Sequence, residues 1–204
     1  MDFNQTFELK DGMRKYNFVR CVLYLQLQAR ELYGSNYHIR PSQRTQLQKL
    51  LAYATADRDT CTFYGLDLSK GLLISGPENS GKTSLLHLLK PFFESERHYF
   101  IRSCREMVYC YDLFGKQSLQ WYTDKELCYC YDDLGIVPRC INTKLDRSVV
   151  WELVKTRFVG STADTHIITR LDTEALCKAY GRHFTALLFR NLNHIEFTES
   201  FNLI

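Results

Sequence analysis

The strongest constraint on the fold is the segment 71–89, in which a glycine-rich turn separates two apolar runs. The run 72–74 predicts a buried strand, and the leucines in 85–89 recur with helical spacing. Between them, residues 76–83 read Gly-Pro-Glu-Asn-Ser-Gly-Lys-Thr, the pattern G-x-x-x-x-G-K-T. A strand, a tight turn and a helix in immediate succession predict an α/β fold that presents this turn at the edge of a sheet.

The residue types in this turn are typical of a loop that binds phosphate. Gly76 and Gly81 allow the backbone to turn tightly and to approach a ligand closely. Lys82 supplies a positive charge for the β- and γ-phosphates, and the Thr83 hydroxyl is placed to ligate Mg²⁺. We therefore predict that this loop binds a nucleoside triphosphate and Mg²⁺. The predicted nucleotide-binding residues are Gly76, Pro77, Glu78, Asn79, Ser80, Gly81, Lys82, Thr83 and Ser84.

Two acids supply the second half of the predicted site. Asp132 and Asp133 follow the apolar run 127–131, whose carboxyl end in a parallel sheet lies at the same edge as the glycine-rich loop. We expect Asp132 to hold Mg²⁺ together with Thr83, and Asp133 to orient or deprotonate the attacking water. Two acids after a strand would by themselves indicate a solvated turn. Combined with the upstream loop, they predict a catalytic site in which Lys82 and Asp133 act on the triphosphate.

Strand and helix patterns alternate from Lys70 onward, and this predicts a parallel five-stranded sheet flanked by helices. Strands are expected at 71–75, 98–102, 127–131, 165–169 and 194–198, and helices at about 82–94, 104–115, 145–158, 172–180 and 183–192. Upstream, we expect helices at about 11–33 and 41–54, the second with Ser42 as its N-cap, and then a loop-like connector, 57–69. The predicted division is a short helical N-terminal segment, 1–69, with a candidate role in partner docking, and a nucleotide-binding core, 70–204.

Composition narrows the choice of compartment and partner. A formal net charge of +3 is too small to identify a nucleic-acid-binding protein. The 8 cysteines include no C-x-x-C pair and no zinc spacing, so we expect reduced thiols that serve as small hydrophobic residues. We find neither an N-terminal signal sequence nor an apolar run of membrane-spanning length, and we expect a cytoplasmic protein.

The order of the downstream motifs carries a resemblance. After Asp132-Asp-Leu-Gly come Thr165-His-Ile-Ile-Thr-Arg-Leu, Tyr180-Gly and Asn193-His-Ile-Glu-Phe. Over about residues 70–198 this order resembles the AAA+ branch that contains bacterial replicative-helicase loaders and the ATPase helpers of insertion-sequence transposases. The resemblance implies an AAA+ P-loop ATPase that assembles with copies of itself, often with DNA. It also implies that the protein loads or remodels a replicative helicase or a transposase.

Three positions depart from the family pattern. Family members usually read Thr-Thr-Asn-Leu or Thr-Ser-Asn-Leu at the fourth strand, where the Asn helps to position the water. This chain retains Thr169, which we carry over as a catalytic residue, but has Arg170 in place of the Asn. Alignment from Tyr180 puts His183 and Leu187 at the two arginine positions of the family, of which the second completes a neighbour's site. Arg182 is the candidate replacement.

These departures keep other functions open. The first alternative is an ATP-dependent adaptor or regulator that hydrolyses ATP weakly or not at all. The second is a small P-loop kinase, which would need an arginine-rich lid that we do not find. The segment 103–126 mixes basic residues with aromatic ones, among them Arg105, Lys116, Trp121 and Tyr122, and is a candidate contact for single-stranded DNA. The residues Met107, Val108, Tyr111 and Leu113 of the same segment favour an ordinary helix core instead.

Overall fold

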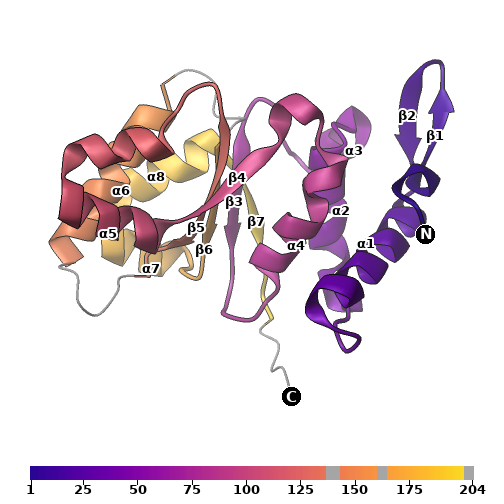
Figure 1. Ribbon diagram of the computed structural model, residues 1–204, viewed down its shortest axis with the longest axis horizontal. Helices are drawn as coiled ribbons and strands as arrows, with labels where there is room; N and C mark the ends of the chain where they lie inside the picture. Colours follow the sequence, from indigo (N-terminus) through magenta and orange to yellow (C-terminus); the bar gives the residue numbers. More distant parts are fainter. Residues whose placement is uncertain (137–142, 160–164, 200–204) are drawn as a thin grey trace. The chain divides into compact units, whose positions relative to one another are not determined.

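The computed structural model of the chain describes residues 1–136, 143–159 and 165–199 (Figure 1). Within these residues, five strands form a parallel sheet in the order β4-β5-β6-β3-β7. The strands are β3 (Gly71–Ser75), β4 (Tyr99–Ser103), β5 (Cys128–Leu134), β6 (Thr165–Thr169) and β7 (Leu192–Glu196). The predicted α/β fold with a parallel five-stranded sheet is confirmed.

Helices connect successive strands of this sheet. They are α4 (Lys82–Leu89), α5 (Cys104–Phe114), α6 (Thr143–Arg157), α7 (Thr173–Tyr180) and α8 (Arg182–Asn191), with a 3-10 helix, η5 (Lys116–Tyr122), after α5. Each of the predicted strands and helices from 71 to 198 is present, with ends displaced by a few residues. The helix α4 ends at Leu89, whereas the sequence predicted a helix to 94, and the 3-10 helix at 90–92 follows it. The strand β5 continues through the acidic pair to Leu134, whereas the sequence predicted an end at 131. No described helix combines the length and the apolar character that crossing a membrane requires.

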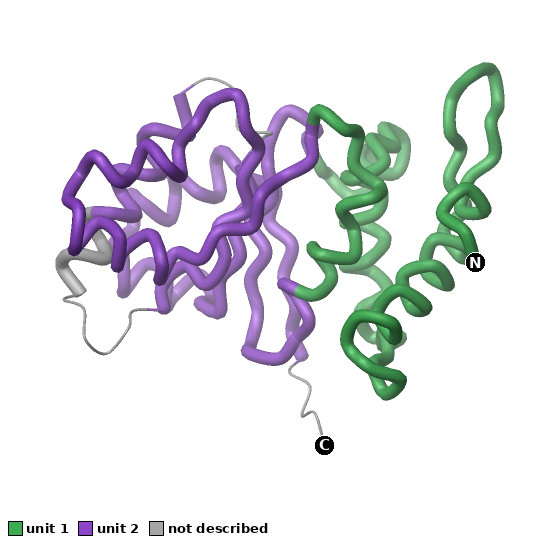
Figure 2. The backbone as a smooth tube through the Cα atoms, in the orientation of Figure 1, with its two compact units in different colours: residues 1–66, 84–96 green, residues 67–83, 97–204 purple. Residues whose placement is uncertain are grey.

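The chain separates into two compact units, shown in Figure 2. Residues Met1–Leu66 and Ser84–Glu96 form the first, and Asp67–Thr83 and Arg97–Ile204 form the second. The second unit contains the whole sheet and the glycine-rich loop as far as Thr83. The functional division into 1–69 and 70–204 stays a prediction.

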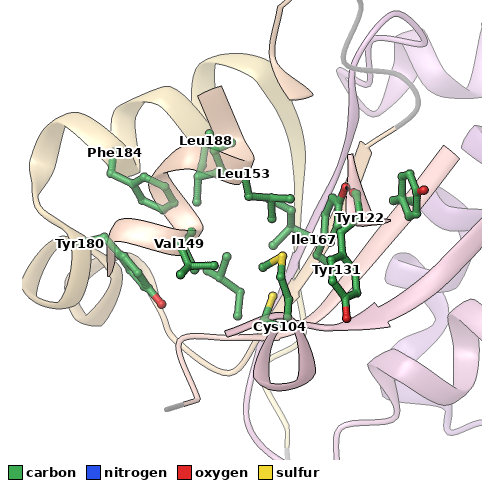
Figure 3. Close-up of a cluster of buried hydrophobic side chains, with 14 of the residues drawn as sticks. Cys104, Tyr122, Tyr131, Val149, Leu153, Ile167, Tyr180, Phe184 and Leu188 are labelled. Atoms are coloured by element: carbon green, nitrogen blue, oxygen red, sulfur yellow. Dashed lines mark hydrogen bonds between the residues drawn. The ribbon is translucent and has the colours of Figure 1, made fainter. Parts of the chain in front are cut away.

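The core of the second unit lies on one face of the sheet, beneath α5, α6, α7 and α8 (Figures 1 and 3). Tyr131 and Ile167 contribute from the strands, and Leu153 and Phe184 from the helices. Each is almost completely buried. Because a buried Leu or Phe stabilises the fold by about 1.5–3 kcal/mol, this layer fixes the strand order and thereby the edge at which the loops meet.

The first unit consists of a hairpin, α-helices and 3-10 helices, and it includes α4 from Ser84 onward. Its elements are η1 (Phe3–Thr6), β1 (Phe7–Lys10), β2 (Met13–Tyr16), α1 (Phe18–Tyr33), η2 (Pro41–Gln43), α2 (Arg44–Ala54), α3 (Arg58–Phe63) and η3 (Lys90–Phe92); η4 (Ser95–Arg97) follows. Aromatic rings pack edge to face within it: the ring centroids of Phe3 and Phe92 are 5.1 Å apart, and those of Tyr24 and Phe92 are 5.9 Å apart.

The predicted helix 11–33 is wrong over its first residues. Asp11 and Gly12 both have positive φ, 53° and 76°, and form the turn between the antiparallel strands β1 and β2. Asp-Gly is a strong hairpin signal because both residues tolerate this conformation. The helix begins only at Phe18, where the Asn17 side chain accepts a hydrogen bond from the Arg20 N–H at 3.1 Å.

Two further predictions for this unit need correction. Ser42 is not an N-cap, because it lies inside η2, and α2 begins at Arg44 without a side-chain cap. The expected connector 57–69 contains the helix α3. Its N-cap is Asp57, whose carboxylate accepts a hydrogen bond from the Thr60 N–H at 3.1 Å.

Candidate nucleotide-binding site

Strand order brings the predicted site together. β6 pairs with β5 on one side and with β3 on the other, all parallel. The carboxyl ends of these strands therefore lie side by side at one edge of the sheet, where open α/β sheets bind ligands. The loop after β3, the acids at the end of β5 and the residues after β6 consequently face a common space.

The glycine-rich loop has the backbone conformation that its glycines permit. Gly76 has φ 143° and Gly81 has φ 82°. A β-carbon at Gly76 would overlap the carbonyl oxygen of Phe197, whose own N–H donates to the Ser75 carbonyl at 2.8 Å. Asn79 has φ 60°, which Asn tolerates better than most residues. Close approach to β7 and positive φ together require glycine at position 76.

Lys82 is the charged group at the centre of the loop. Its ammonium donates to the carbonyls of Gly76 at 2.7 Å and Pro77 at 2.6 Å and to the Ser80 hydroxyl at 2.9 Å. The side chain is buried, and burial, followed by the nearby Arg170 guanidinium, lowers the pKa of Lys82 to about 8. A triphosphate would favour the protonated form, so this buried cation is matched to an anionic ligand.

Thr83 and Asp132 form the candidate Mg²⁺ site. The Thr83 hydroxyl donates to Asp132 Oδ2 at 2.9 Å, which places a hydroxyl and a carboxylate oxygen side by side. Burial raises the pKa of Asp132, and the hydrogen bonds from Thr83 and from the Asp133 N–H offset part of that rise. A bound cation would favour the ionised carboxylate. Hard oxygen ligands that leave room for water and phosphate suit Mg²⁺, so the donor set fits this ion.

A larger set of protein ligands is not found. The described residues contain no group of three or more His, Cys, Asp or Glu side chains that could hold a metal ion. A site of one acid and one hydroxyl is what Mg²⁺ uses when the substrate phosphates complete its coordination.

Asp133 projects from an irregularity in β5. Its φ is 59°, and the register between β5 and β6 shifts between Tyr131 and Leu134. The Asp133 N–H donates to Asp132 Oδ1 at 2.8 Å, so the backbone at Asp133 orients the Asp132 carboxylate. Such a bulge redirects a side chain that regular pleating would place on a fixed face. The sequence predicted that both acids follow the strand, whereas the strand runs through them.

Thr169 ends β6 with its hydroxyl engaged by the backbone. The hydroxyl donates to the Leu134 carbonyl at 2.8 Å and accepts from the Leu171 N–H at 3.0 Å. It is completely buried. A catalytic role for Thr169 stays a prediction, and these contacts indicate that it holds the end of β5 against the turn after β6.

Arg170 is the residue whose place the sequence did not predict. Its Nη1 lies 2.6 Å from Glu78 Oε1 in the loop, and its Nη2 lies 3.5 Å from Asp133 Oδ1. The sequence showed only that an asparagine was replaced. Since β6 lies between β3 and β5, the residue that follows it lies between the loop and the acids, and knowledge of the strand order would have revealed this.

The two positions that the sequence resemblance aligned with arginines, His183 and Leu187, lie elsewhere, on α8. The His183 ring stacks on Trp151, with centroids 5.7 Å apart. Leu187 is half-buried and packs against the core of the second unit, so it belongs to the hydrophobic layer. Arg182 is exposed at the first residue of α8. Its role as a replacement for the missing arginine stays a prediction.

The candidate DNA-contacting segment is only partly accessible. Arg105, Lys116 and Trp121 are exposed, and Trp121 packs against Phe114 with ring centroids 5.6 Å apart. Tyr122 is buried in the core and cannot stack on a base, so that part of the prediction is wrong.

The helix of this segment divides its residues between the core and the surface. Met107 and Val108 are in the core, as the helix pattern predicted, and Tyr111 packs against it. Leu113 is exposed, contrary to the prediction of a core position.

Comparison with known proteins supports the fold. No protein-family model matches this sequence, and no curated protein sequence matches it significantly. Among solved structures, the chain is similar to a crystal structure of the DnaC helicase loader, with a TM-score of 0.60 and 17% sequence identity. The similarity covers 83% of this chain and 99% of the other. The chain thus shares with that structure an α/β fold, here with a parallel five-stranded sheet, and at this identity the similarity concerns the fold alone.

Proposed function

We propose that this protein is an ATP-binding ATPase of the AAA+ type that loads or remodels a DNA-processing partner. The observation that carries the proposal is the meeting of Lys82, the Thr83–Asp132 pair and Asp133 at one edge of the sheet. Similarity to a helicase-loader structure supports a replicative helicase as the partner over a transposase.

Each residue of the site has a role that its contacts support. Backbone N–H groups of the loop bind the phosphates at the start of α4, and Lys82 exchanges its carbonyl contacts for phosphate oxygens. Thr83 and Asp132 hold Mg²⁺, which when bound neutralises charge on the phosphates. Asp133 accepts the proton of the attacking water or orients it.

The N-terminal segment offers a surface for the partner. On α1, the side chains of Val19, Leu23 and Leu27 are exposed at a spacing of four residues, opposite a buried row. An apolar stripe on a helix fits the groove of a partner protein, read at i and i+4 positions. We assign this stripe to the DNA-processing partner.

DNA and further copies of the chain are additional candidate partners. The exposed Trp121 and Phe114, with Lys116 and Arg105 on the same segment, supply base stacking and phosphate contact for single-stranded DNA. Self-assembly rests on the resemblance to AAA+ loaders.

Phosphate release measures the proposed reaction directly. The purified chain is incubated with ATP and Mg²⁺, alone and with single-stranded DNA, beside the Lys82→Ala variant. The proposal predicts inorganic phosphate from the wild type and none above background from the variant. Transfer of phosphate to a small acceptor instead of water would favour the kinase and contradict the loader.

A non-hydrolysing adaptor is the second candidate function. The observation that favours it is the packing of Leu187 into the hydrophobic layer, at the position where loaders carry an arginine. This alternative predicts that ATP binds and is recovered intact after prolonged incubation. Phosphate release that depends on Lys82 excludes it.

A further inference from the structure

Arg170 occupies the position from which a single side chain reaches both halves of the site. β6 is the strand between β3 and β5, and Arg170 is the first residue after it. The guanidinium spans from Glu78 in the loop, at 2.6 Å, to Asp133 at the end of β5, at 3.5 Å. Both contacts are within the second unit.

The ion pairs of Arg170 are of a kind that a phosphate group can replace. Glu78 is 62% exposed and forms a short contact with one end of the guanidinium, whereas Asp133 is more buried and forms a longer one. Arg170 also lies close enough to the Lys82 ammonium to lower the pKa of that group. A planar guanidinium binds phosphate oxygens in pairs, and a multiply charged phosphate competes well with one exposed carboxylate.

We propose that Arg170 contacts the γ-phosphate of ATP within its own subunit, released for this purpose from Glu78. The inference rests on the proposed function and deepens it. It makes Arg170 a catalytic residue that supplies from within the chain the positive charge that an arginine from a neighbouring subunit supplies in other ATPases. Glu78 then acts as the group that holds Arg170 while the γ-phosphate is absent.

A residue that contacts only the γ-phosphate should affect the affinity for ATP much more than the affinity for ADP. The affinities for ATP and ADP are measured by calorimetry for the wild type, Arg170→Ala, Arg170→Lys and Glu78→Gln, with Arg58→Ala as a control that removes an exposed arginine of the first unit. We expect Arg170→Ala to weaken ATP at least about tenfold and ADP much less. Glu78→Gln should strengthen ATP relative to ADP, and Arg58→Ala should change neither.

Turnover tests whether the arginine acts within its own subunit. Arg170→Ala should lower kcat by about 100-fold or more. A mixture of Arg170→Ala with Lys82→Ala then distinguishes the two geometries, because Lys82→Ala still carries Arg170 but lacks the loop lysine. The proposal predicts that the mixture stays inactive.

The outcomes separate the two ideas. If Arg170→Ala weakens ATP and ADP equally or leaves both unchanged while the wild type hydrolyses ATP, the role of Arg170 is wrong and the proposed function stands. Recovery of activity in the mixture would overturn the claim that Arg170 acts in its own subunit. If the wild type binds no ATP, the proposed function fails and this inference with it.

Discussion

At the scale of the residue, the site contains two ionisable side chains, Lys82 and Asp132, whose pKa values burial shifts from their ordinary values. Lys82 is a buried ammonium that donates hydrogen bonds to carbonyls, and Asp132 is a half-buried carboxyl beside a hydroxyl. Burial disfavours the charged form of each, which is a free-energy cost in the free protein. A magnesium triphosphate supplies opposite charge to both groups. We therefore expect ligand binding to offset the free-energy cost of burying the charged forms of Lys82 and Asp132.

The pKa of Lys82 predicts how ATP affinity varies with pH. In the free protein this pKa is about 8, and a bound triphosphate raises it. Below pH 8 Lys82 is already protonated, so its ionisation does not affect affinity. Above pH 8 binding takes up a proton, and the dissociation constant should rise up to about tenfold per pH unit.

Calorimetry at pH 8.5 in buffers of different ionisation enthalpy measures that proton uptake. The matched variant is Lys82→Arg, whose guanidinium stays protonated and takes up no proton. Equal proton uptake by the wild type and Lys82→Arg would show that another group titrates.

We predict that replacement of Gly76 destabilises the fold, because the Phe197 carbonyl lies close to it. Replacement by Ala introduces both an unfavourable φ and an overlap with the Phe197 carbonyl. Gly181 also has positive φ, 91°, but nothing lies within 4 Å of its β-carbon position. We expect Gly181→Ala to lower the free energy of unfolding by about 1–3 kcal/mol, and Gly76→Ala by about 1–3 kcal/mol more. Equal losses in denaturant titrations would contradict the close packing of the loop on β7.

At the scale of the element, the sheet is held by contacts that reach across its amino-terminal edge. Arg157, the last residue of α6, donates to the carbonyls of Asp124 at 2.6 Å and Leu127 at 3.0 Å and to the Thr165 hydroxyl at 3.1 Å. The guanidinium also lies over the Tyr129 ring, 5.1 Å from its centroid. One buried side chain thus positions the starts of β5 and β6, the two strands that end at the acids and at Arg170.

Removal of this anchor should be costly. We expect Arg157→Met to lower the free energy of unfolding by about 2–4 kcal/mol, because two partly buried carbonyls and the buried Thr165 hydroxyl lose their hydrogen-bond donor. Lys155→Ala on the same helix, whose side chain is 61% exposed, should have no measurable effect. Denaturant unfolding of both variants checks this, and similar stability of the two would refute the anchoring role.

The two faces of α1 should also differ. Leu25→Ala removes a fully buried side chain and should lower the free energy of unfolding by about 2–5 kcal/mol. Leu23→Ala, on the exposed stripe, should stay within about 0.5 kcal/mol of the wild type. The same Leu23 variant should weaken capture of a replicative helicase if the stripe is the docking surface. Unchanged capture would place docking elsewhere.

Sequence patterns predicted elements where periodicity was strong and the competing signals were weak. The strand before the glycine-rich loop and the start of the helix after it were correct because apolar runs and the motif agree there. The hairpin was missed because the local turn signal at Asp11-Gly12 was included in a helix. Arg170 was seen only as a departure, since its contacts with Glu78 and Asp133 depend on strand order, which no local pattern contains.

At the scale of the whole molecule, the fold is shared with a protein that is only 17% identical. In this chain strands and helices alternate, and the loops after the parallel strands meet at one edge of the sheet. The loop lysine and the acid pair lie at this edge, whereas the hydrophobic Leu187 occupies the position that the sequence resemblance aligned with an arginine. The arrangement therefore supports nucleotide binding most strongly. For ATP hydrolysis, it supports a proposal in which the catalytic residues all come from the same chain.

The central claim is that ATP binds at the glycine-rich loop, and calorimetric titration of the full chain with ATP and Mg²⁺ tests it most directly. We predict one ATP per chain for the wild type, the same for Lys155→Ala, and a dissociation constant at least about 100-fold higher for Lys82→Ala. If the wild type gives no binding heat and no thermal stabilisation by ATP, or if Lys82→Ala binds as tightly as the wild type, the account is contradicted.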